Sequence, residues 1–198
     1  MVKREIRIAR RSRFFCVMES LVLAKFILAT PWLLYLAVKD YRTRQLPNSV
    51  TLGGAAVMVA AALGYDIQYC VGSLITGAVC ALFLLLPFFL RAAGAGDVKM
   101  LFAAGIIAGP GNVLNLILMV SFAGLVLAFA MLFFKAVNPA RLKHYLRCVF
   151  DFKYDRQEGR KSLPPSESEA CRVPFGVAIA AGLFINLSLQ VLAVYYAS

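Results

Sequence analysis

Two aspartates lie where an acidic side chain is unfavourable, at the ends of long apolar runs. Asp97 ends the stretch Gly94-Ala95-Gly96-Asp97, and Asp40 follows an apolar run that begins at Ser20. Ionisable groups at a membrane border are costly, so each aspartate is a candidate functional residue. Two carboxyl groups about 3 Å apart can share a proton, because like charges at that distance do not easily both ionise. One can then take a proton from water while the other protonates an amide, which is aspartic-protease chemistry.

The glycines beside the second acid have a physical use in such a site. Without a Cβ, Gly94 and Gly96 let the chain bend into a helix and let a substrate backbone approach the carboxylate. The simpler alternative is that Asp97 only caps a helix, since helix starts favour Asp. For Asp40, the simpler alternative is a surface ion pair with a neighbouring basic side chain.

The elements that position these acids are membrane helices. Hydrophobic residues make up 61% of the 198 residues and charged residues only 16%, which is too apolar for an ordinary soluble domain. A spanning helix needs roughly 20 apolar residues. The expected spans are Ser20–Val38, Val50–Leu63, Cys70–Leu90, Asn112–Phe134 and Pro174–Ala197.

The ten residues Met100–Gly109 are harder to assign, because they could form a short sixth helix or a re-entrant segment. We expect an all-α, polytopic bundle of about six transmembrane helices. It forms one membrane domain over residues 20–198, after a basic tail over residues 1–19.

The net charge of +11 is unevenly distributed. If Met100–Gly109 crosses the membrane, three loops with 14 basic residues share one side, against six basic residues in the tail. The positive-inside rule then predicts that both acids face the cytoplasm. The tail favours the opposite orientation, so we expect it either to be translocated or to lie on the membrane surface.

The loop over residues 135–173 contains nine of the basic residues. Leu142, Tyr145, Leu146 and Val149 recur there at helical spacing, which predicts an amphipathic helix in the interface, followed by a linker. A partner-docking helix is the alternative. Because the basic residues lie at membrane borders, anionic headgroups account for them, and we expect membrane lipid but no nucleic acid as a partner.

The cysteines do not suggest a metal centre. The five cysteines include no C-x-x-C pair, and His144 is the single histidine. We therefore expect no structural zinc site, no other metal and no cofactor.

Three motifs resemble those of the prepilin peptidases, which are GxGD-type aspartic proteases of the membrane. The stretch from Asp40 to Asn48 is similar to the first motif, an Asp at the end of the first helix followed by Arg and then Ile/Leu-Pro-Asn. The stretch from Gly94 to Lys99 matches the second motif, including its Lys. Pro174-Phe175-Gly176 resembles the element before the final helix. The resemblance covers most of the chain from Val38 onward.

The resemblance implies that Asp40 and Asp97 are the catalytic pair and that Gly94 and Gly96 shape the site. The implied activity is endopeptidase removal of the leader from prepilin-like substrates at the cytoplasmic face of the inner membrane. Pilus or secretion assembly proteins are further implied partners.

Supporting residues are implied in the same way. Pro47 fixes the backbone after the first acid, and Asn48 is expected to cap the next helix through its side chain. Lys99 and Arg44 are expected to be neighbours that tune the acids or hold a headgroup.

One family feature is missing from the sequence. Members that also methylate the new N-terminus carry a cytoplasmic insertion with paired C-x-x-C motifs between the first two helices, whereas about ten residues separate them here. The chain therefore looks like the short form that serves Flp-type (tight adherence) pili, with archaeal preflagellin peptidases as relatives.

A rival hypothesis is a non-enzymatic membrane assembly factor or transporter that uses the two acids for protons or cations. Such a relay would place the acids at different depths, whereas a protease needs both at one membrane face. Presenilin-like proteases fit less well, because their first acid lies inside a helix after Tyr, whereas Asp40 follows Lys39 at a helix end.

Overall fold

The computed structural model describes residues 2–43, 46–89, 93–133 and 174–197, which lie in helices and their short connections. The predicted all-α class is confirmed. The helices are α1 (Val2–Thr43), α2 (Asn48–Tyr65), α3 (Ile67–Phe89), α4 (Ala95–Ala108), α5 (Val113–Phe133) and α8 (Phe175–Ala197).

Five helical stretches are long and apolar enough to cross a membrane, and each corresponds to one of the five predicted spans, with bounds shifted by up to five residues. They are Ser20–Thr43, Asn48–Tyr65, Ile67–Phe89, Val113–Phe133 and Phe175–Tyr196. The helix α4 differs, because its 14 residues rise only about 21 Å, less than the roughly 30 Å of a hydrocarbon core. The segment Met100–Gly109 is thus most of a short helix that begins earlier, at Ala95.

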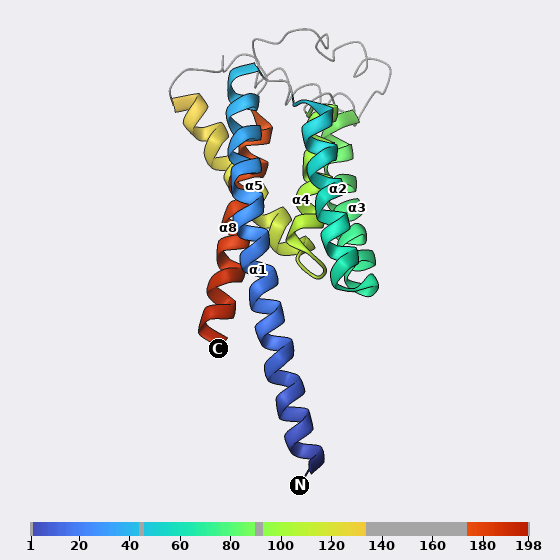
Figure 1. Cartoon of the computed structure of the whole chain (residues 1–198). Helices are drawn as coiled ribbons and strands as arrows, with labels where there is room; N and C mark the ends of the chain where they lie inside the picture. Colours follow the sequence, from blue (N-terminus) through green and yellow to red (C-terminus); the bar gives the residue numbers. More distant parts are fainter. Residues whose placement is uncertain (1, 44–45, 90–92, 134–173, 198) are drawn as a thin grey trace, which may run out of the picture.

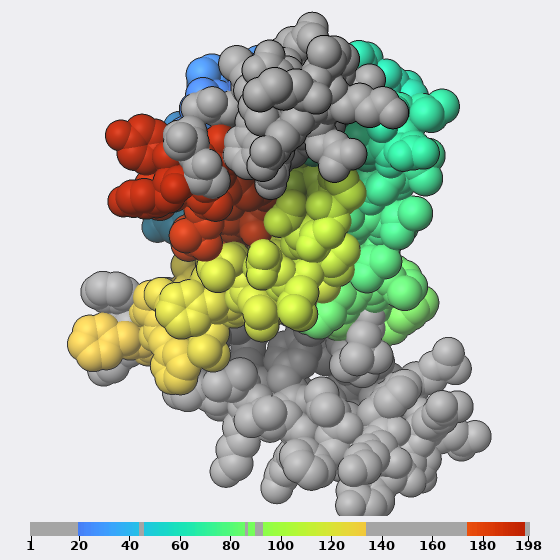
Figure 2. Space-filling model, turned by 90° about the horizontal axis from the view of Figure 1, so that it is seen from below, coloured from blue at the N-terminus to red at the C-terminus, as the bar shows by residue number. Residues whose placement is uncertain are grey.

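The short helix α4 lies at the centre of the bundle. Figure 1 shows α1, α5 and α8 grouped together beside a second group of α2, α3 and α4, and α4 contacts α2, α3, α5 and α8. Seen from below in Figure 2, the yellow-green surface of α4 lies between the red surface of α8 and the green surface of α3. The residues of α4 from Met100 to Ala108 are buried, except for the half-buried Phe102.

Small residues let these helices approach closely, as small-xxx-small spacing predicts. A Cβ on Gly105 would lie 2.7 Å from Gly77 Cα, and one on Gly182 would lie 2.6 Å from Val120 Cα. The pairs α3–α4 and α5–α8 therefore pack backbone to backbone. Gly109, four residues after Gly105, ends α4 with a φ of 86°.

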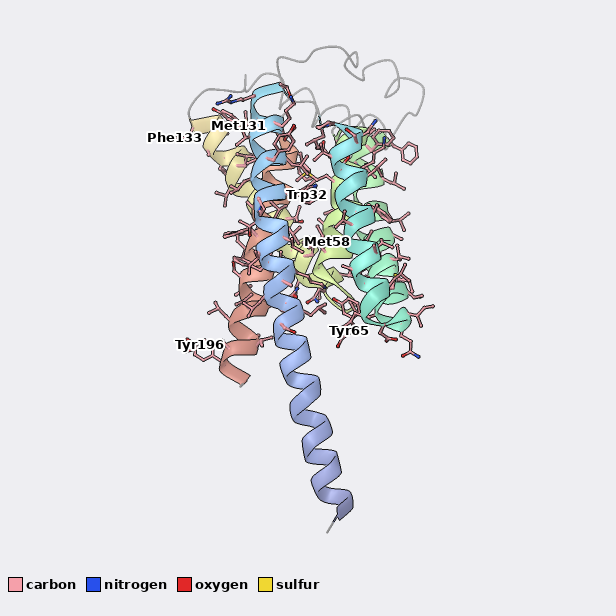
Figure 3. The ribbon with its side chains drawn as sticks, in the orientation of Figure 1. Trp32, Met58, Tyr65, Met131, Phe133 and Tyr196 are labelled. Atoms are coloured by element: carbon pink, nitrogen blue, oxygen red, sulfur yellow. The ribbon has the colours of Figure 1, made fainter. Side chains whose placement is uncertain are left out.

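The first two helices meet mainly through one aromatic side chain. Trp32 Nε1 donates a hydrogen bond to the Val50 carbonyl at 2.9 Å, and the indole fills the space that Gly54 leaves. Figure 3 shows Trp32 between α1 and α2. Elsewhere the two helices contact each other sparsely, because α1 packs chiefly on α8.

Four helix ends carry the sequence motifs to one end of the bundle. There α1 ends, while α2, α4 and α8 begin, as Figure 1 shows. We call this the acid end, defined by Asp40, Asp97 and the first turns of α2, α4 and α8. The N-terminus of α1 lies beyond the opposite end. The predicted amphipathic helix and linker between residues 135 and 173 lie outside the described residues.

This arrangement makes membrane orientation testable on a single helix, since Ser49 and Tyr65 lie at opposite ends of α2. If the acid end faces the cytoplasm, Tyr65→Cys should react with an impermeant thiol reagent added to intact cells, and Ser49→Cys should not. Both variants are made in a cysteine-free background, and labelling after lysis is the control for reactivity. The reverse pattern would place both acids on the outer face.

Candidate active site

The first acid is buried although it lies at a helix end. Asp40, three residues before the end of α1, is only 5% exposed. Its Oδ2 accepts a hydrogen bond from the Val177 N–H at 3.3 Å, an N–H that also approaches the Pro174 carbonyl at 3.1 Å. A buried carboxylate needs such partners, and the positive end of the α8 dipole favours a negative charge at this position.

Gly176 makes this contact possible. A Cβ on Gly176 would lie 2.7 Å from Asp40 Oδ2, so no larger side chain fits without displacing the carboxylate. The motif Pro174-Phe175-Gly176 therefore brings the first turn of α8 directly against Asp40. Because α8 begins more than 130 residues after α1 ends, this contact joins the first and the last of the described helices.

The second acid also lies at a helix N-terminus, that of its own helix. Asp97 is the third residue of α4, and its Oδ2 accepts a hydrogen bond from the Gly94 N–H at 2.9 Å. Gly94, not Asp97, is the N-cap residue. The carboxylate thus satisfies one of the N–H groups that a helix start leaves unpaired.

The connection between α1 and α2 rests on the first turn of α4. Leu46 packs on Gly96, where a Cβ would lie 3.2 Å from Leu46 Cβ. Lys99 Nζ donates a hydrogen bond to Asn48 Oδ1 at 3.0 Å. These two contacts bring the residues that follow Asp40 onto the residues that flank Asp97.

The structure corrects one prediction here and leaves another outside its range. Asn48 does not cap α2, because it is the first helical residue and its side-chain oxygen accepts from Lys99. The N-cap is Pro47, whose carbonyl accepts the N–H groups of Val50 and Thr51 at 3.1 Å. Arg44 lies outside the described residues.

Two contributors to the site were missing from the residues predicted for it. Gly176 had a signal, since it belongs to a motif that resembles a family element. Val177 had none, because it acts through its backbone N–H, which every residue except proline provides.

The chemistry that this end offers is that of carboxyl groups. Within the described ranges, no cluster of three or more His, Cys, Asp or Glu side chains is placed to hold a metal ion. Cys70 and Cys80 are buried, free thiols. Two carboxyl groups at one end of a bundle, each held at a helix N-terminus, suit general acid–base catalysis.

Comparison with known proteins matches this site to a family. The model of the type IV leader peptidase family matches residues 27–129, just over half of the chain. The matched region contains Asp40 and Asp97 and ends before Gly176. No curated protein and no solved structure matches the chain.

The contact between α8 and Asp40 predicts opposite effects for two Gly→Ala substitutions. Gly176→Ala should destabilise the protein by about 1–3 kcal/mol, because its methyl group would overlap Asp40. Gly53→Ala is the matched control, since a Cβ there meets nothing within 4 Å, and it should stabilise α2 by about 0.5–1 kcal/mol. Unfolding in detergent measures both effects. Equal stability of the two variants would contradict this close packing.

Proposed function

The chain belongs to the type IV leader peptidase family, and from this premise we propose that Asp40 and Asp97 are its catalytic pair. The protein is a membrane protease of the aspartic type that processes prepilin leader peptides. The observation that carries the assignment is the placement of both aspartates at the acid end. There the Leu46–Asn48 segment contacts the first turn of α4.

In the proposed mechanism the two carboxyl groups share one proton. The ionised group takes a proton from a water molecule, whose oxygen attacks the carbonyl carbon of the scissile peptide bond. The protonated group gives its proton to the carbonyl oxygen. In the second step the group that took the water proton gives it to the leaving amine as the C–N bond breaks, and the other group takes back a hydroxyl proton from the tetrahedral intermediate, so the pair again holds one proton. No covalent bond to the enzyme forms.

The supporting residues act by holding the two acids. We assign Gly94 to orienting the Asp97 carboxylate through its N–H. We propose that Gly96, which has no Cβ, leaves the space in which Leu46 packs. Lys99 holds Asn48, and Pro47 starts α2, so the segment after Asp40 keeps its position on α4. For Arg44, which follows Asp40 by four residues in the sequence, we propose a role as a positively charged group that tunes the acid or holds a headgroup.

The shared end of the bundle argues against the rival proposal of a proton or cation relay. A relay moves an ion across the membrane and needs acids at successive depths. Asp40 is in the last turn of α1 and Asp97 in the first turn of α4, and both turns lie at the acid end. This placement suits two groups that act on one bond.

We place the enzyme in the inner membrane, with the acid end and the loop over residues 135–173 facing the cytoplasm. Prepilin-like proteins are the substrates, and pilus or secretion assembly proteins are the proposed partners. Only four residues separate Thr43 from Asn48, which leaves no room there for an inserted domain with paired C-x-x-C motifs. This supports the short form, a peptidase without methyltransferase activity that serves Flp-type pili.

Replacing either acid with its amide tests the catalytic pair. Asp40→Asn and Asp97→Asn should each lower kcat for leader removal by about 10³-fold or more, because an amide can neither accept nor donate the shared proton. Cleavage of a purified prepilin is followed by mass spectrometry, and circular dichroism checks folding.

The matched control is Asp66→Asn, which removes an exposed acid at the turn between α2 and α3, opposite the acid end. This variant should cleave at the wild-type rate. A folded Asp40→Asn or Asp97→Asn variant that keeps substantial activity would overturn the assignment.

The short form makes a separate prediction about the product. Incubation with a prepilin and S-adenosylmethionine should give a cleaved protein with an unmodified N-terminus. A family member that carries the insertion serves as the positive control. A methylated product would refute the short-form assignment and leave the peptidase assignment untouched.

A further inference from the structure

A lysine inside the first span lies near the membrane border opposite the acids. Lys25 precedes Asp40 by 15 residues, or about 22 Å along α1. With Asp40 at one border of a roughly 30 Å hydrocarbon core, Lys25 lies within about 8 Å of the other border. Tyr69, in the first turn of α3, reaches the same level and binds Lys25.

The Lys25 ammonium group lies against the end of α4. Its Nζ donates a hydrogen bond to the Tyr69 hydroxyl and lies 4.6 Å from the centroid of that ring. A Cβ on Gly109 would lie 3.1 Å from Nζ and 2.5 Å from the Tyr69 oxygen. The cation and the phenol thus flank the turn that ends α4.

The end of α4 is already capped by other side chains. The Ala108 carbonyl accepts hydrogen bonds from Gln190 Nε2 and Asn112 Nδ2, both at 3.1 Å. Lys25 is therefore not needed for that carbonyl. An ammonium group has three N–H donors, and a charge shielded from water needs compensation. Among the described side chains, the one hydrogen-bonded to this ammonium group is the uncharged Tyr69.

Lys25 and Tyr69 line a cavity whose other walls are apolar. The cavity measures about 60 Å³, several times the roughly 10–15 Å³ that one water molecule requires. It lies between α1 and α2 over α4, and its walls include Ala24, Leu28, Met58, Ala61, Ile106 and Ile107. Figure 3 shows Met58 between the two groups of helices, on the side of Trp32 away from the acid end.

We propose that this cavity binds an anionic phospholipid. Its phosphate lies against the Lys25 ammonium and the Tyr69 hydroxyl, a few methylene groups next to the headgroup enter the cavity between α1 and α2, and the rest of the acyl chain lies outside it in the bilayer. The charge is complementary, Lys25 lies within about 8 Å of a membrane border, and the apolar walls suit methylene groups. The lipid occupies part of the interface between α1 and α2 that Trp32 does not cover; we call this interface the α1–α2 seam.

Lipid binding to the purified, detergent-solubilised full chain tests this site without an activity assay. Native mass spectrometry and thermal unfolding are followed during titration with phosphatidylglycerol or phosphatidylcholine. The wild type should bind phosphatidylglycerol at least ten-fold more tightly and gain more thermal stability from it. Lys25→Met and Ala61→Phe should both lose this preference, the first by removing the cation and the second by filling the apolar cavity. Lys25→Arg should keep it.

The matched control is Lys39→Met, which removes the same charge from the same helix at the other membrane border and should keep the preference. Equal binding of the two lipids by the wild type would overturn the proposal. The proposal would also be overturned if folded Lys25→Met or Ala61→Phe kept the wild-type preference for phosphatidylglycerol. If Lys25→Met does not fold, Ala61→Phe alone tests the site. Inorganic phosphate that matches the stabilisation by phosphatidylglycerol would show a plain anion site and would also overturn it.

Discussion

The acid end depends on the burial of one carboxylate against the start of a helix. Asp40 is withdrawn from water, so its charge must be balanced by the Val177 N–H and by the positive end of α8. That requirement brings α8 to α1 and demands a glycine at position 176. Because the bond joins residues 137 positions apart, it forms only when α8 has packed on α1. The first acid and the last helix are therefore one structural unit.

The second acid is positioned by a helix that is too short to span the membrane. The helix α4 can begin at the acid end and stop inside the bilayer because its far end is buried in protein and capped by side chains. Close packing of Gly105 on Gly77 fixes it laterally against α3. Asp97 thus belongs to a central helix whose two ends are both polar and whose middle is apolar.

Hydrophobic runs of 14 to 24 residues predicted the five long helices, because length and apolar content are what a membrane span requires. The beginning of α4 was harder to predict, because glycines such as Gly94 and Gly96 are as typical of a loop as of a helix start. The proposed cap at Asn48 was wrong for a related reason. An Asn before an apolar run resembles a cap, but a distant lysine binds its oxygen instead. Contacts between remote segments, and those made by backbone atoms such as the Val177 N–H, leave little trace in residue types.

The two acids are held by different groups of helices. Asp40 belongs to the group of α1 and α8, whereas Asp97 belongs to the group of α2, α3 and α4. The distance between Asp40 and Asp97 therefore depends on how the two groups of helices pack against each other. They do so through the contact of α4 with α8 and through the sparse α1–α2 seam. Trp32 and the Leu46–Asn48 segment cross that seam near the acid end, and the proposed lipid fills it farther away. If Asp40 and Asp97 act together as proposed, the two groups of helices must be held against each other, so contacts remote from the acids contribute to the geometry of the pair.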